Sequence, residues 1–421
     1  MTFNRRQFLK ISSAAAGVAG LSPLLAQAKG KAAKAKVVIV GGGFGGATCA
    51  RYLRLWDPSI EVTLIEMNKE FVSCPYSNTV LAGINKLKDL TFGYGGLKKA
   101  GVRLVRDEVT GFDTEKRRVK CKSGKTFAYD RLVLSGGIEM RFDQIEGYDA
   151  AAQKTVMHAW KAGPQTATLR KQLEAMPDGG TFVISIPPGP YRCPPGPYER
   201  ISMVANYLKR EKPKSKIVAL DSNPDIVSKK GLFLAAWKKH YEGMIDYHPN
   251  SKPSRIDAKT KTILIDVNEV KGDVINVIPP MRAATLTDWA GVRTDANSWC
   301  PVDLRTLESK AIPNVHIIGD SISAPTPKSG SMANNYGKVC AAALVELLNG
   351  RSPESVPVIT NTCFSATSEN TAMHVADVWR MGDDGKWVKA KSGGVSKEES
   401  ELEWQYMAAW AKNIWADTLG L

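Results

Sequence analysis

The seven cysteines are the residues of this chain best suited to redox chemistry, and their number is odd, so at least one lacks an intrachain disulfide partner. Cys49 and Cys340 fall inside expected helices, where a cysteine is usually a small buried hydrophobic residue. Cys121 lies in an expected polar hairpin at 117–128 and Cys300 in an expected loop, and we assign no role to either. The remaining cysteines lie in expected loops of unusual composition and are the candidates for chemistry: Cys74, Cys193 and Cys363.

Cys193 has proline-rich surroundings, because residues 187–200 read PPGPYRCPPGPYER. This run follows an expected strand at 180–186 and precedes another at 216–221, where a dinucleotide-binding domain places its glycine-rich phosphate turn. Prolines lack the amide hydrogens that hold a pyrophosphate. We therefore expect this domain to lack an NAD(P)H site. The stiff loop indicates that Cys193 itself takes part in the reaction.

A first dinucleotide site is predicted near residue 40. Residues 37–40 (VVIV) are typical of a buried parallel strand, and a glycine turn leads from them into an expected helix at 47–56. In this turn Gly41 permits the tight bend, Gly43 lets a pyrophosphate approach the backbone, and Gly46 lets helix and strand pack closely. The helix N-terminus then faces the phosphates.

The acidic residue that such a site requires is also present. An expected strand at 61–65 ends at Glu66, about 20 residues beyond the last glycine, where a carboxylate binds the ribose hydroxyls. Strand, glycine turn, helix, second strand and carboxylate occur in the required order. A lone glycine motif would be weak, but the full unit strongly predicts a bound dinucleotide.

A distant segment indicates that this dinucleotide is FAD. Residues 314–320 are expected to form a strand ending in Gly319 and Asp320, with a helix following at 332–348. In flavoproteins with two dinucleotide domains, this Gly-Asp pair contacts the ribityl and phosphate groups. The positive end of the helix faces the pyrimidine ring, where negative charge gathers on reduction. Residues 129–137 add the crossover by which such folds leave the FAD domain. An ordinary helix cap is the alternative reading of Asp320.

Residues 1–28 are expected to be a twin-arginine export signal. Arg5 and Arg6 precede a mildly apolar stretch at 11–25, and residues 26–28 (AQA) offer a small-x-small cleavage site. The stretch is shorter than the ~20 apolar residues of a membrane span, and we expect no transmembrane segment elsewhere. This route carries folded proteins, often with a cofactor inserted, so we expect a periplasmic flavoprotein.

Composition and charge narrow the class of protein. The chain has 421 residues, of which 43% are hydrophobic and 24% charged, which excludes disorder throughout. At ~150 residues per domain, this length predicts two or three cores. The net charge of +15 suits an anionic partner, membrane surface or small anion. We expect no nucleic-acid binding, because the lysines are scattered and there is no aromatic-basic repeat.

Four stretches of the sequence resemble the flavoprotein subunit of flavocytochrome c sulfide dehydrogenase, and the likeness covers essentially the whole mature chain. They are the residues around Cys74 (71–78, FVSCPYSN), the cysteine-proline run 192–200, the helix start 327–330 (PKSG) and the residues around Cys363 (361–364, NTCF). Pro75 follows Cys74 where some members of the family have another residue. The cysteine-proline run is long and rare, so the match is close.

The resemblance implies a role for each motif. In that family the cysteine matching Cys74 forms a thioether to the flavin, and those matching Cys193 and Cys363 form a redox disulfide beside the isoalloxazine. The glutamate matching Glu199 is a proposed acid/base, for which an exposed ion pair with Arg200 or another base is the alternative. The helix start adds three residues to the expected cofactor site: Lys328, Ser329 and Gly330.

The function implied is a periplasmic sulfide dehydrogenase. Sulfide attacks the disulfide, leaving a persulfide and a thiolate, and electrons pass through FAD singly to a c-type cytochrome, giving sulfur or polysulfide. The chain has no C-x-x-C-H haem attachment sequence, so the haem belongs to a partner subunit. A sulfide:quinone oxidoreductase-like enzyme is the first alternative, supported by an expected amphipathic helix at about 399–419. A non-enzymatic flavin-binding partner of a cytochrome is the second.

These placements predict an α/β fold with two Rossmann-like domains arranged as in glutathione reductase. The FAD domain is discontinuous, at 30–146 and 283–353, and the second domain occupies 147–282 without an NAD fingerprint. Residues 354–421 form a C-terminal domain that caps the flavin and supplies an interface.

Overall fold

The strands of the first predicted domain form a five-stranded parallel sheet with the order β19-β9-β1-β2-β5. The structure is a computed structural model that describes residues 34–293 and 298–421, so the predicted export signal lies outside the described residues. The sheet belongs to the compact unit Ala35–Leu421. Its strands are β1 (Ala35–Val40), β2 (Ile60–Glu66), β5 (Arg103–Arg106), β9 (Arg131–Leu134) and β19 (Val315–Ile317).

Two long helices, both expected from the sequence, pack together against this sheet. They are α2 (Phe44–Trp56) and α9 (Gly330–Leu348), and each begins two or three residues earlier than predicted. Gly337 allows their close approach, because a Cβ there would lie 2.6 Å from the carbonyl oxygen of Gly45. Both helix N-termini are thereby fixed near the carboxyl ends of the strands that precede them.

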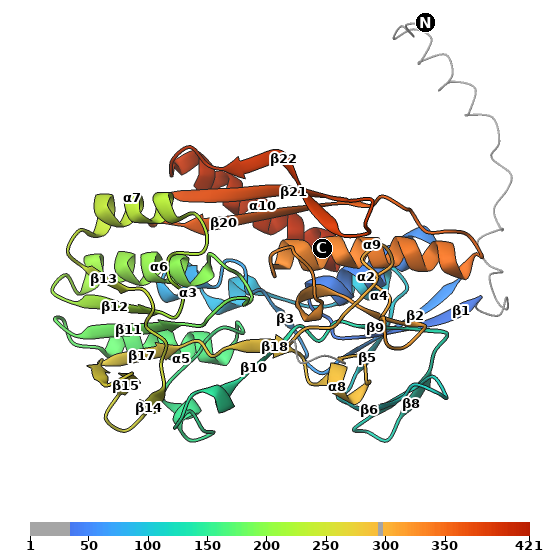
Figure 1. The fold of residues 1–421 in the computed structure, drawn as a ribbon, viewed down its shortest axis with the longest axis horizontal. Helices are drawn as coiled ribbons and strands as arrows, with labels where there is room; N and C mark the ends of the chain where they lie inside the picture. Colours follow the sequence, from blue (N-terminus) through green and yellow to red (C-terminus); the bar gives the residue numbers. More distant parts are fainter. Residues whose placement is uncertain (1–33, 294–297) are drawn as a thin grey trace, which may run out of the picture. The chain divides into compact units, whose positions relative to one another are not determined.

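The second predicted domain contains a four-stranded parallel sheet with the order β13-β12-β11-β17 (Figure 1). Its strands and helices are β11 (Thr181–Ile186), β12 (Lys216–Asp221), β13 (Ile245–His248), β17 (Val274–Val277), α5 (Pro164–Ala175), α6 (Gly196–Glu211) and α7 (Lys230–Tyr241). Strands β10 (Ile138–Met140) and β18 (Met281–Ala283) pair where the chain enters and leaves this region. The chain therefore passes between the two parallel sheets at these strands, and the domain boundaries at 146 and 283 stay predictions.

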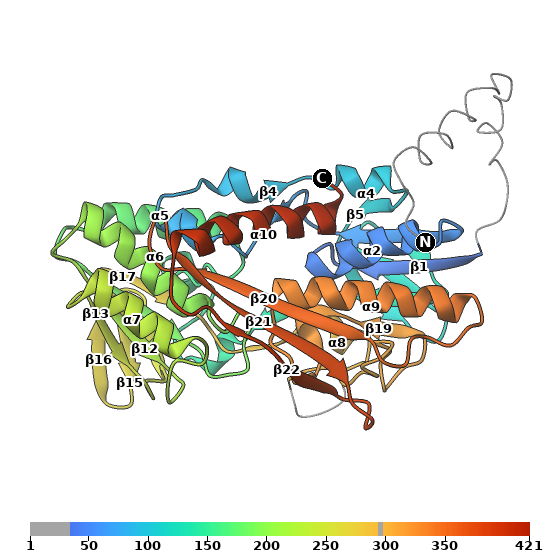
Figure 2. The same ribbon diagram turned by 90° about the horizontal axis from the view of Figure 1, so that it is seen from above.

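The C-terminal region contains a sheet that the sequence did not predict. Strands β20 (Val358–Ala366), β21 (Ala372–Met381) and β22 (Trp387–Val395) are antiparallel, and α10 (Glu401–Leu419) follows them. Figure 2 shows α10 beside α2 and α9, against which it packs. The expected helix at 399–419 is confirmed. The expectation of a loop around Cys363 is wrong, because Cys363 lies inside β20 and pairs with Val375.

Shorter elements complete the unit, and they include the predicted polar hairpin at 117–128 as β7 and β8. The strands are β3 (Phe71–Val72), β4 (Thr91–Phe92), β6 (Val109–Asp113), β7 (Arg118–Cys121), β8 (Thr126–Ala128), β14 (Arg255–Asp257), β15 (Thr262–Ile265) and β16 (Asn268–Lys271). The short helices are α3 (Asn78–Leu81), α4 (Gly95–Lys99), α8 (Leu286–Trp289) and the 3-10 turns η1 (Leu87–Leu90), η2 (Phe142–Gln144), η3 (Ala152–Lys154) and η4 (Gly319–Ser321).

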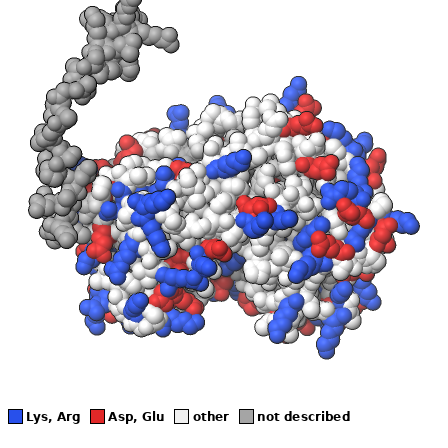
Figure 3. All heavy atoms as spheres, turned by 180° about the vertical axis from the view of Figure 1, so that it is seen from behind, with Lys and Arg blue, Asp and Glu red and all other residues white. Residues whose placement is uncertain are grey.

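The surface carries both signs of charge. On the face shown in Figure 3, basic side chains are scattered among acidic and uncharged ones. Among the described residues, no helix has the length and apolar character needed to cross a membrane.

Candidate active site

A cavity of about 600 Å³ lies where the glycine turn, the Gly-Asp segment and the start of α9 meet. Of the residues predicted to bind the cofactor, those that line it are Gly41, Gly43, Glu66, Cys74, Gly319, Asp320 and Gly330. Gly46, Lys328 and Ser329 lie outside its wall. The structure therefore brings together residues from both ends of the discontinuous first domain around a space of ligand size.

The glycine turn has the geometry that a dinucleotide requires. Gly41 has φ +99°, and a Cβ on it would lie 2.4 Å from the carbonyl oxygen of Ser135. A Cβ on Gly46 would lie 1.9 Å from the carbonyl oxygen of Gly41, so only glycine lets α2 pack here. A Cβ on Gly43 would meet no atom within 4 Å, because Gly43 faces the open cavity. Its backbone is accessible to a phosphate group.

The polar groups around this cavity fit FAD. No side chain caps the N-terminus of α2, so its first amides are available to a pyrophosphate. Glu66 lies at the wall, where its Oε2 accepts from the amide of Gly42 at 2.6 Å and its Oε1 accepts from the amide of Asn68 at 2.7 Å. Oε1 also accepts from Nδ2 of Asn68 at 2.6 Å, so the remaining lone pair for a ribose hydroxyl is on Oε2.

Asp320 also faces this cavity with unused hydrogen-bonding capacity. It is 9% exposed, and burial raises the pKa of its carboxyl, against the opposing effect of Arg192 and Lys328. Within the described residues, no hydrogen bond reaches its carboxylate oxygens. The helix-cap reading of Asp320 is wrong, because Ser329 caps α9 by accepting from the amide of Met332 at 3.0 Å. Asp320 is thus available to hydroxyl groups of a bound ligand.

Lys328 supports the neighbouring loops rather than the cavity itself. Its Nζ donates to the carbonyl oxygens of Asp320 and Ile322 at 2.8 and 2.9 Å, and it lies 3.6 Å from the centre of the Trp299 ring. Burial lowers the pKa of this ammonium to about 8. The carbonyl oxygen of Lys328 accepts from the amide of Cys193 at 2.7 Å. Lys328 therefore joins the Gly-Asp segment to the cysteine loop.

A smaller cavity of about 80 Å³ adjoins the large one and collects the predicted catalytic residues. Cys193, Cys363 and Glu199 all line it, although Cys363 lies in a strand far along the chain from the loop of Cys193 and the helix of Glu199. The two cavities share four wall residues: Cys74, Pro75, Arg192 and Gly330. A pair of sulfurs and a carboxyl group are thus concentrated beside the space that fits a flavin.

The two cysteines are held differently. Cys193 lies in the loop before α6 with φ +62°, a strained conformation of the kind that clusters at functional sites. Cys363 lies in β20, and its Sγ donates to Oδ1 of Asn361 at 3.5 Å. Both are thiols in the structure, and burial raises the pKa of each. Lys229 opposes this rise at both sulfurs, and at Cys363 it is the strongest opposing influence.

Glu199 is buried in the first turn of α6 and is 7% exposed. Its Oε2 accepts from Nδ2 of Asn78 at 2.7 Å, and its Oε1 accepts from the amide of Ala366 at 3.0 Å. Burial raises the pKa of the carboxyl despite these hydrogen bonds. The alternative of an exposed ion pair is wrong, since Arg200 is also buried and donates instead to the carbonyl oxygens of His158 and Ala159.

Sequence reasoning assigned no role to three residues that shape this site. Asn78 and Arg200 stand at the ends of the quoted motifs 71–78 and 192–200, so their position in those motifs was the available signal. Asn78 orients Glu199, and Nε of Arg200 donates to Oδ1 of Asn78 at 3.1 Å. Lys229 lies outside every motif, and no sequence signal identified it.

In the second domain, the residues at the position where a nicotinamide dinucleotide would bind contact one another. Asp221 ends β12, but it is fully buried and its Oδ2 accepts from the hydroxyls of Tyr198 and Tyr247 at 2.7 and 2.8 Å. Asn223 binds the proline loop, donating from Nδ2 to the carbonyl oxygen of Pro187 at 3.0 Å. The carboxylate and the turn that would bind a dinucleotide are thus both engaged in contacts within the protein.

We therefore expect NADH not to reduce the flavin at a useful rate. Mixing the purified flavoprotein with excess NADH without oxygen, and following the flavin absorbance, checks this expectation. Dithionite serves as the control that the same flavin is reducible. Rapid and saturable bleaching by NADH would contradict this expectation.

The fold and the large cavity identify the structural class to which the protein belongs. Residues 35–173 match the family model of the pyridine nucleotide-disulphide oxidoreductases. The solved sulfide:quinone oxidoreductase of Aquifex aeolicus superposes with a TM-score of 0.76 at 20% identity, over 91% of this chain and 92% of that one. The protein is an α/β flavoprotein of the FAD-dependent disulfide-oxidoreductase type, as the sequence predicted.

The particular family follows from the other matches. Residues 166–279 match the central region of the sulfide dehydrogenase [flavocytochrome c] flavoprotein chain, and residues 355–419 match the flavin-binding region of flavocytochrome c sulphide dehydrogenase. A stretch of 45 residues is 64% identical to this flavoprotein chain from Chlorobaculum thiosulfatiphilum, covering 11% of this chain and 94% of that sequence. The chain belongs to this family, which confirms the predicted resemblance.

A longer but weaker similarity reaches the quinone-linked enzymes. The mitochondrial sulfide:quinone oxidoreductase of Dictyostelium discoideum is 24% identical over 326 residues, which are 74% of this chain and 70% of that protein. The matches therefore agree on a flavoprotein oxidoreductase and differ in the electron acceptor that their names give.

Proposed function

We propose that this chain oxidises sulfide at a Cys193–Cys363 disulfide and, through FAD, passes electrons singly to a c-type cytochrome subunit, giving sulfur or polysulfide. The observation that carries the proposal is the small cavity, which both cysteines and Glu199 line beside the FAD-sized space. We further propose that the protein works in the periplasm after twin-arginine export of residues 1–28.

The sulfur chemistry needs only groups in and around this cavity. A hydrosulfide ion bonds to one sulfur of the disulfide, the bond between the two cysteines breaks, and a persulfide and a thiolate result. Glu199 is placed to move a proton between the attacking sulfur species and the cysteines, and burial raises the pKa of its carboxyl. Arg192 also lines this cavity and provides positive charge for a small anion.

FAD bound in the large cavity would supply an acceptor that takes two electrons and releases them one at a time. The glycine turn, Glu66 and Asp320 would hold it, and Cys74 stands at the wall shared with the small cavity. A covalent bond from Cys74 to the flavin is part of the proposal.

A c-type cytochrome is the proposed acceptor because the family model names a flavocytochrome and this chain has no haem attachment sequence of its own. The second candidate is a quinone-linked enzyme. It is favoured by the long match to sulfide:quinone oxidoreductases and by α10, where Leu402 and Tyr406 are about half exposed on one helix face. The non-enzymatic alternative, which a large separation of Cys193 and Cys363 would favour, loses support because both line one cavity.

The test is to purify the exported protein with its co-purifying partners and add sulfide without oxygen. We expect flavin bleaching followed by reduction of a c-type haem in the same complex. A short-chain ubiquinone added to the complex serves as the competing acceptor. If that quinone is reduced rapidly while no haem is reduced, the quinone-linked function replaces the proposed one, and if the flavin does not bleach, sulfide is not the substrate.

A further inference from the structure

Lys229 is a buried ammonium placed directly behind Cys363. It is the residue before α7, it is 7% exposed, and its φ of +54° is unusual for a residue with a side chain. Its Nζ donates to the carbonyl oxygen of Cys363 at 3.0 Å and to the Oγ of Ser365 at 2.9 Å. Lys229 does not line the small cavity, so it contacts Cys363 through the backbone of β20 rather than through the cavity.

This ammonium has no formal counter-ion at contact distance. Within the described residues no ion pair includes Lys229, and both of its hydrogen-bond acceptors are neutral. A buried charge that lacks a partner is costly. Burial lowers the pKa of Lys229 to about 8, and the proximity of Cys363, Glu199 and Cys193, in that order, opposes this fall. One of the three N–H donors of the ammonium remains unused by the protein.

The nearby carboxylates are already engaged elsewhere. Both oxygens of Glu199 accept hydrogen bonds, from Asn78 and Ala366. Glu403 on α10 pairs with His374 at 2.7 Å, and Asp377 on β21 pairs with Lys389 at 2.6 Å. Among the groups whose negative charge acts on Lys229, Cys363 acts most strongly, ahead of Glu199, Cys193 and Glu403.

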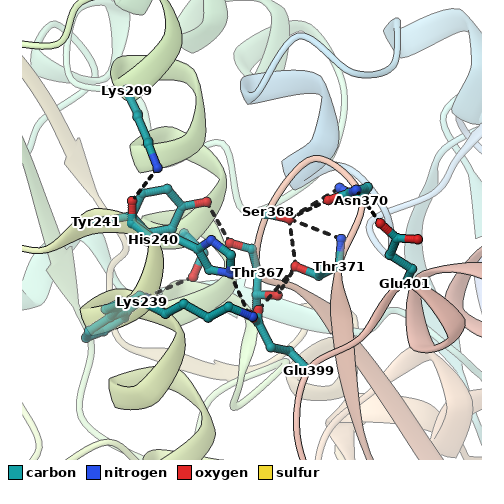
Figure 4. Close-up of polar contacts among 12 residues, drawn as sticks. Lys209, Lys239, His240, Tyr241, Thr367, Ser368, Asn370, Thr371, Glu399 and Glu401 are labelled. Atoms are coloured by element: carbon teal, nitrogen blue, oxygen red, sulfur yellow. Dashed lines mark hydrogen bonds and ion pairs between the residues drawn. The ribbon is translucent and has the colours of Figure 1, made fainter.

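Both ends of α7 are attached to the C-terminal region, which fixes the position of Lys229. Figure 4 shows the far end, where the hydroxyl of Tyr241 donates to the carbonyl oxygen of Thr367 at 2.7 Å. Lys239 and His240 both contact Glu399 there, at 2.9 and 2.5 Å. The near end is held by the contacts of Lys229 to β20. A helix held at both ends keeps the ammonium at one distance from Cys363.

The surroundings of the two sulfurs are unequal. Lys229, Asn361 and Ser329 all favour negative charge on Cys363, and the more weakly acting Asp377 disfavours it. At Cys193, by contrast, Glu199 and the other cysteine disfavour it, although Arg192 and Lys229 oppose them. An anion is therefore better accommodated on Cys363 than on Cys193.

We propose that Lys229 is a positioning residue that provides the counter-charge for a Cys363 thiolate, so that Cys363 is the sulfur released when the disulfide opens. This inference rests on the proposed disulfide chemistry. The sulfur of hydrosulfide bonds to Sγ of Cys193 and keeps its proton, the bond between the two cysteines breaks, and its electron pair stays on Sγ of Cys363. Atoms and charge balance without a further reactant.

The test measures thiolate formation directly, without sulfide. The flavin-loaded protein is treated with dithiothreitol, and the rate at which iodoacetamide alkylates Cys363 is followed by peptide mass spectrometry from pH 6 to pH 10. In Lys229→Gln, which keeps a donor for the Cys363 carbonyl but no charge, we expect alkylation of Cys363 below its pKa to slow about tenfold, since loss of one close opposite charge raises a pKa by about one unit or more.

Three variants separate charge from structure. Lys229→Arg is expected to retain a rate close to the parent, and Lys229→Met to slow Cys363 as Lys229→Gln does. Lys230→Met is the matched control, because Lys230 is the next residue but is exposed and pairs with Asp225 at 2.5 Å. We expect the control to match the parent. A parental alkylation rate in Lys229→Gln overturns the inference, whichever result Lys229→Met gives.

A second measurement tests which sulfur is released. One equivalent of sulfide is added to the oxidised parent, and the persulfide is mapped by mass spectrometry. We expect it on Cys193, and a persulfide on Cys363 would overturn the assignment. If sulfide does not react at all, the proposed function fails, while the alkylation result still decides the role of Lys229.

Discussion

Replacing either Cys193 or Cys363 by serine is expected to lower the rate of sulfide-dependent flavin reduction by several orders of magnitude, while the protein still folds and binds flavin. A serine hydroxyl cannot form the disulfide that hydrosulfide must open. The fold is expected to survive because serine is nearly isosteric with cysteine, and both side chains line a cavity. Stopped-flow absorbance of the flavin after mixing with sulfide, without oxygen, measures the effect.

The controls for this experiment come from the same chain. Cys121→Ser changes a buried cysteine in the β6-β7-β8 hairpin sheet that lines neither cavity, and it is expected to react at the parental rate. Glu199→Gln is expected to lose less than the cysteine variants, because the amide keeps an acceptor oxygen for one of its two hydrogen bonds while proton transfer is lost. Near-parental sulfide turnover in either cysteine variant would remove the disulfide mechanism and most of the proposed function.

The features that sequence reasoning predicted well are determined locally. The strand, glycine turn and helix at 37–56 form one continuous segment, and the clash that requires glycine at position 46 comes from within that segment. A Cβ there would strike the backbone of Gly41, only five positions earlier. The parallel strands were recognisable for a similar reason, since buried strands are continuous apolar runs.

The features that were missed depend on contacts between distant segments. Strand β20 does not alternate cleanly between apolar and polar residues, because it is covered partly by α9 and partly by α6. The residues around Cys363 therefore read as a loop. Lys229 gave no signal because its importance comes from a strand more than a hundred residues later, to which its ammonium binds.

The catalytic cluster could be predicted only in part from the residues themselves. Its cysteines were selected by their unusual neighbours, but the residues alone left several disulfide partners open, and the pairing came from the family resemblance. The structure adds the physical link, because a proline-stiffened loop and an antiparallel strand bring both thiols to the wall of one cavity. Loop stiffness is visible in a sequence, whereas the convergence of a loop and a strand requires the packed fold.

Replacing Cys74 by alanine is expected to remove flavin that stays attached to the protein after acid precipitation. Cys74 lines both cavities and is partly exposed, and its Sγ accepts from the amide of Ala162 at 3.4 Å, which holds the sulfur at the wall of the flavin-sized space. The same substitution should leave a bound but extractable flavin, because Gly43, Glu66 and Asp320 still supply the dinucleotide contacts.

The measurement is the flavin absorbance of the washed acid precipitate, together with the mass of the peptide that contains residue 74. Cys193→Ala is the matched control, since it changes another cavity cysteine but not the one expected to carry the flavin, and it should keep the acid-stable signal. If the Cys74→Ala protein retains as much acid-stable flavin as the parent, the thioether at Cys74 is wrong. Fully extractable flavin in the parent would contradict the thioether equally, because the dinucleotide contacts alone would then hold the cofactor.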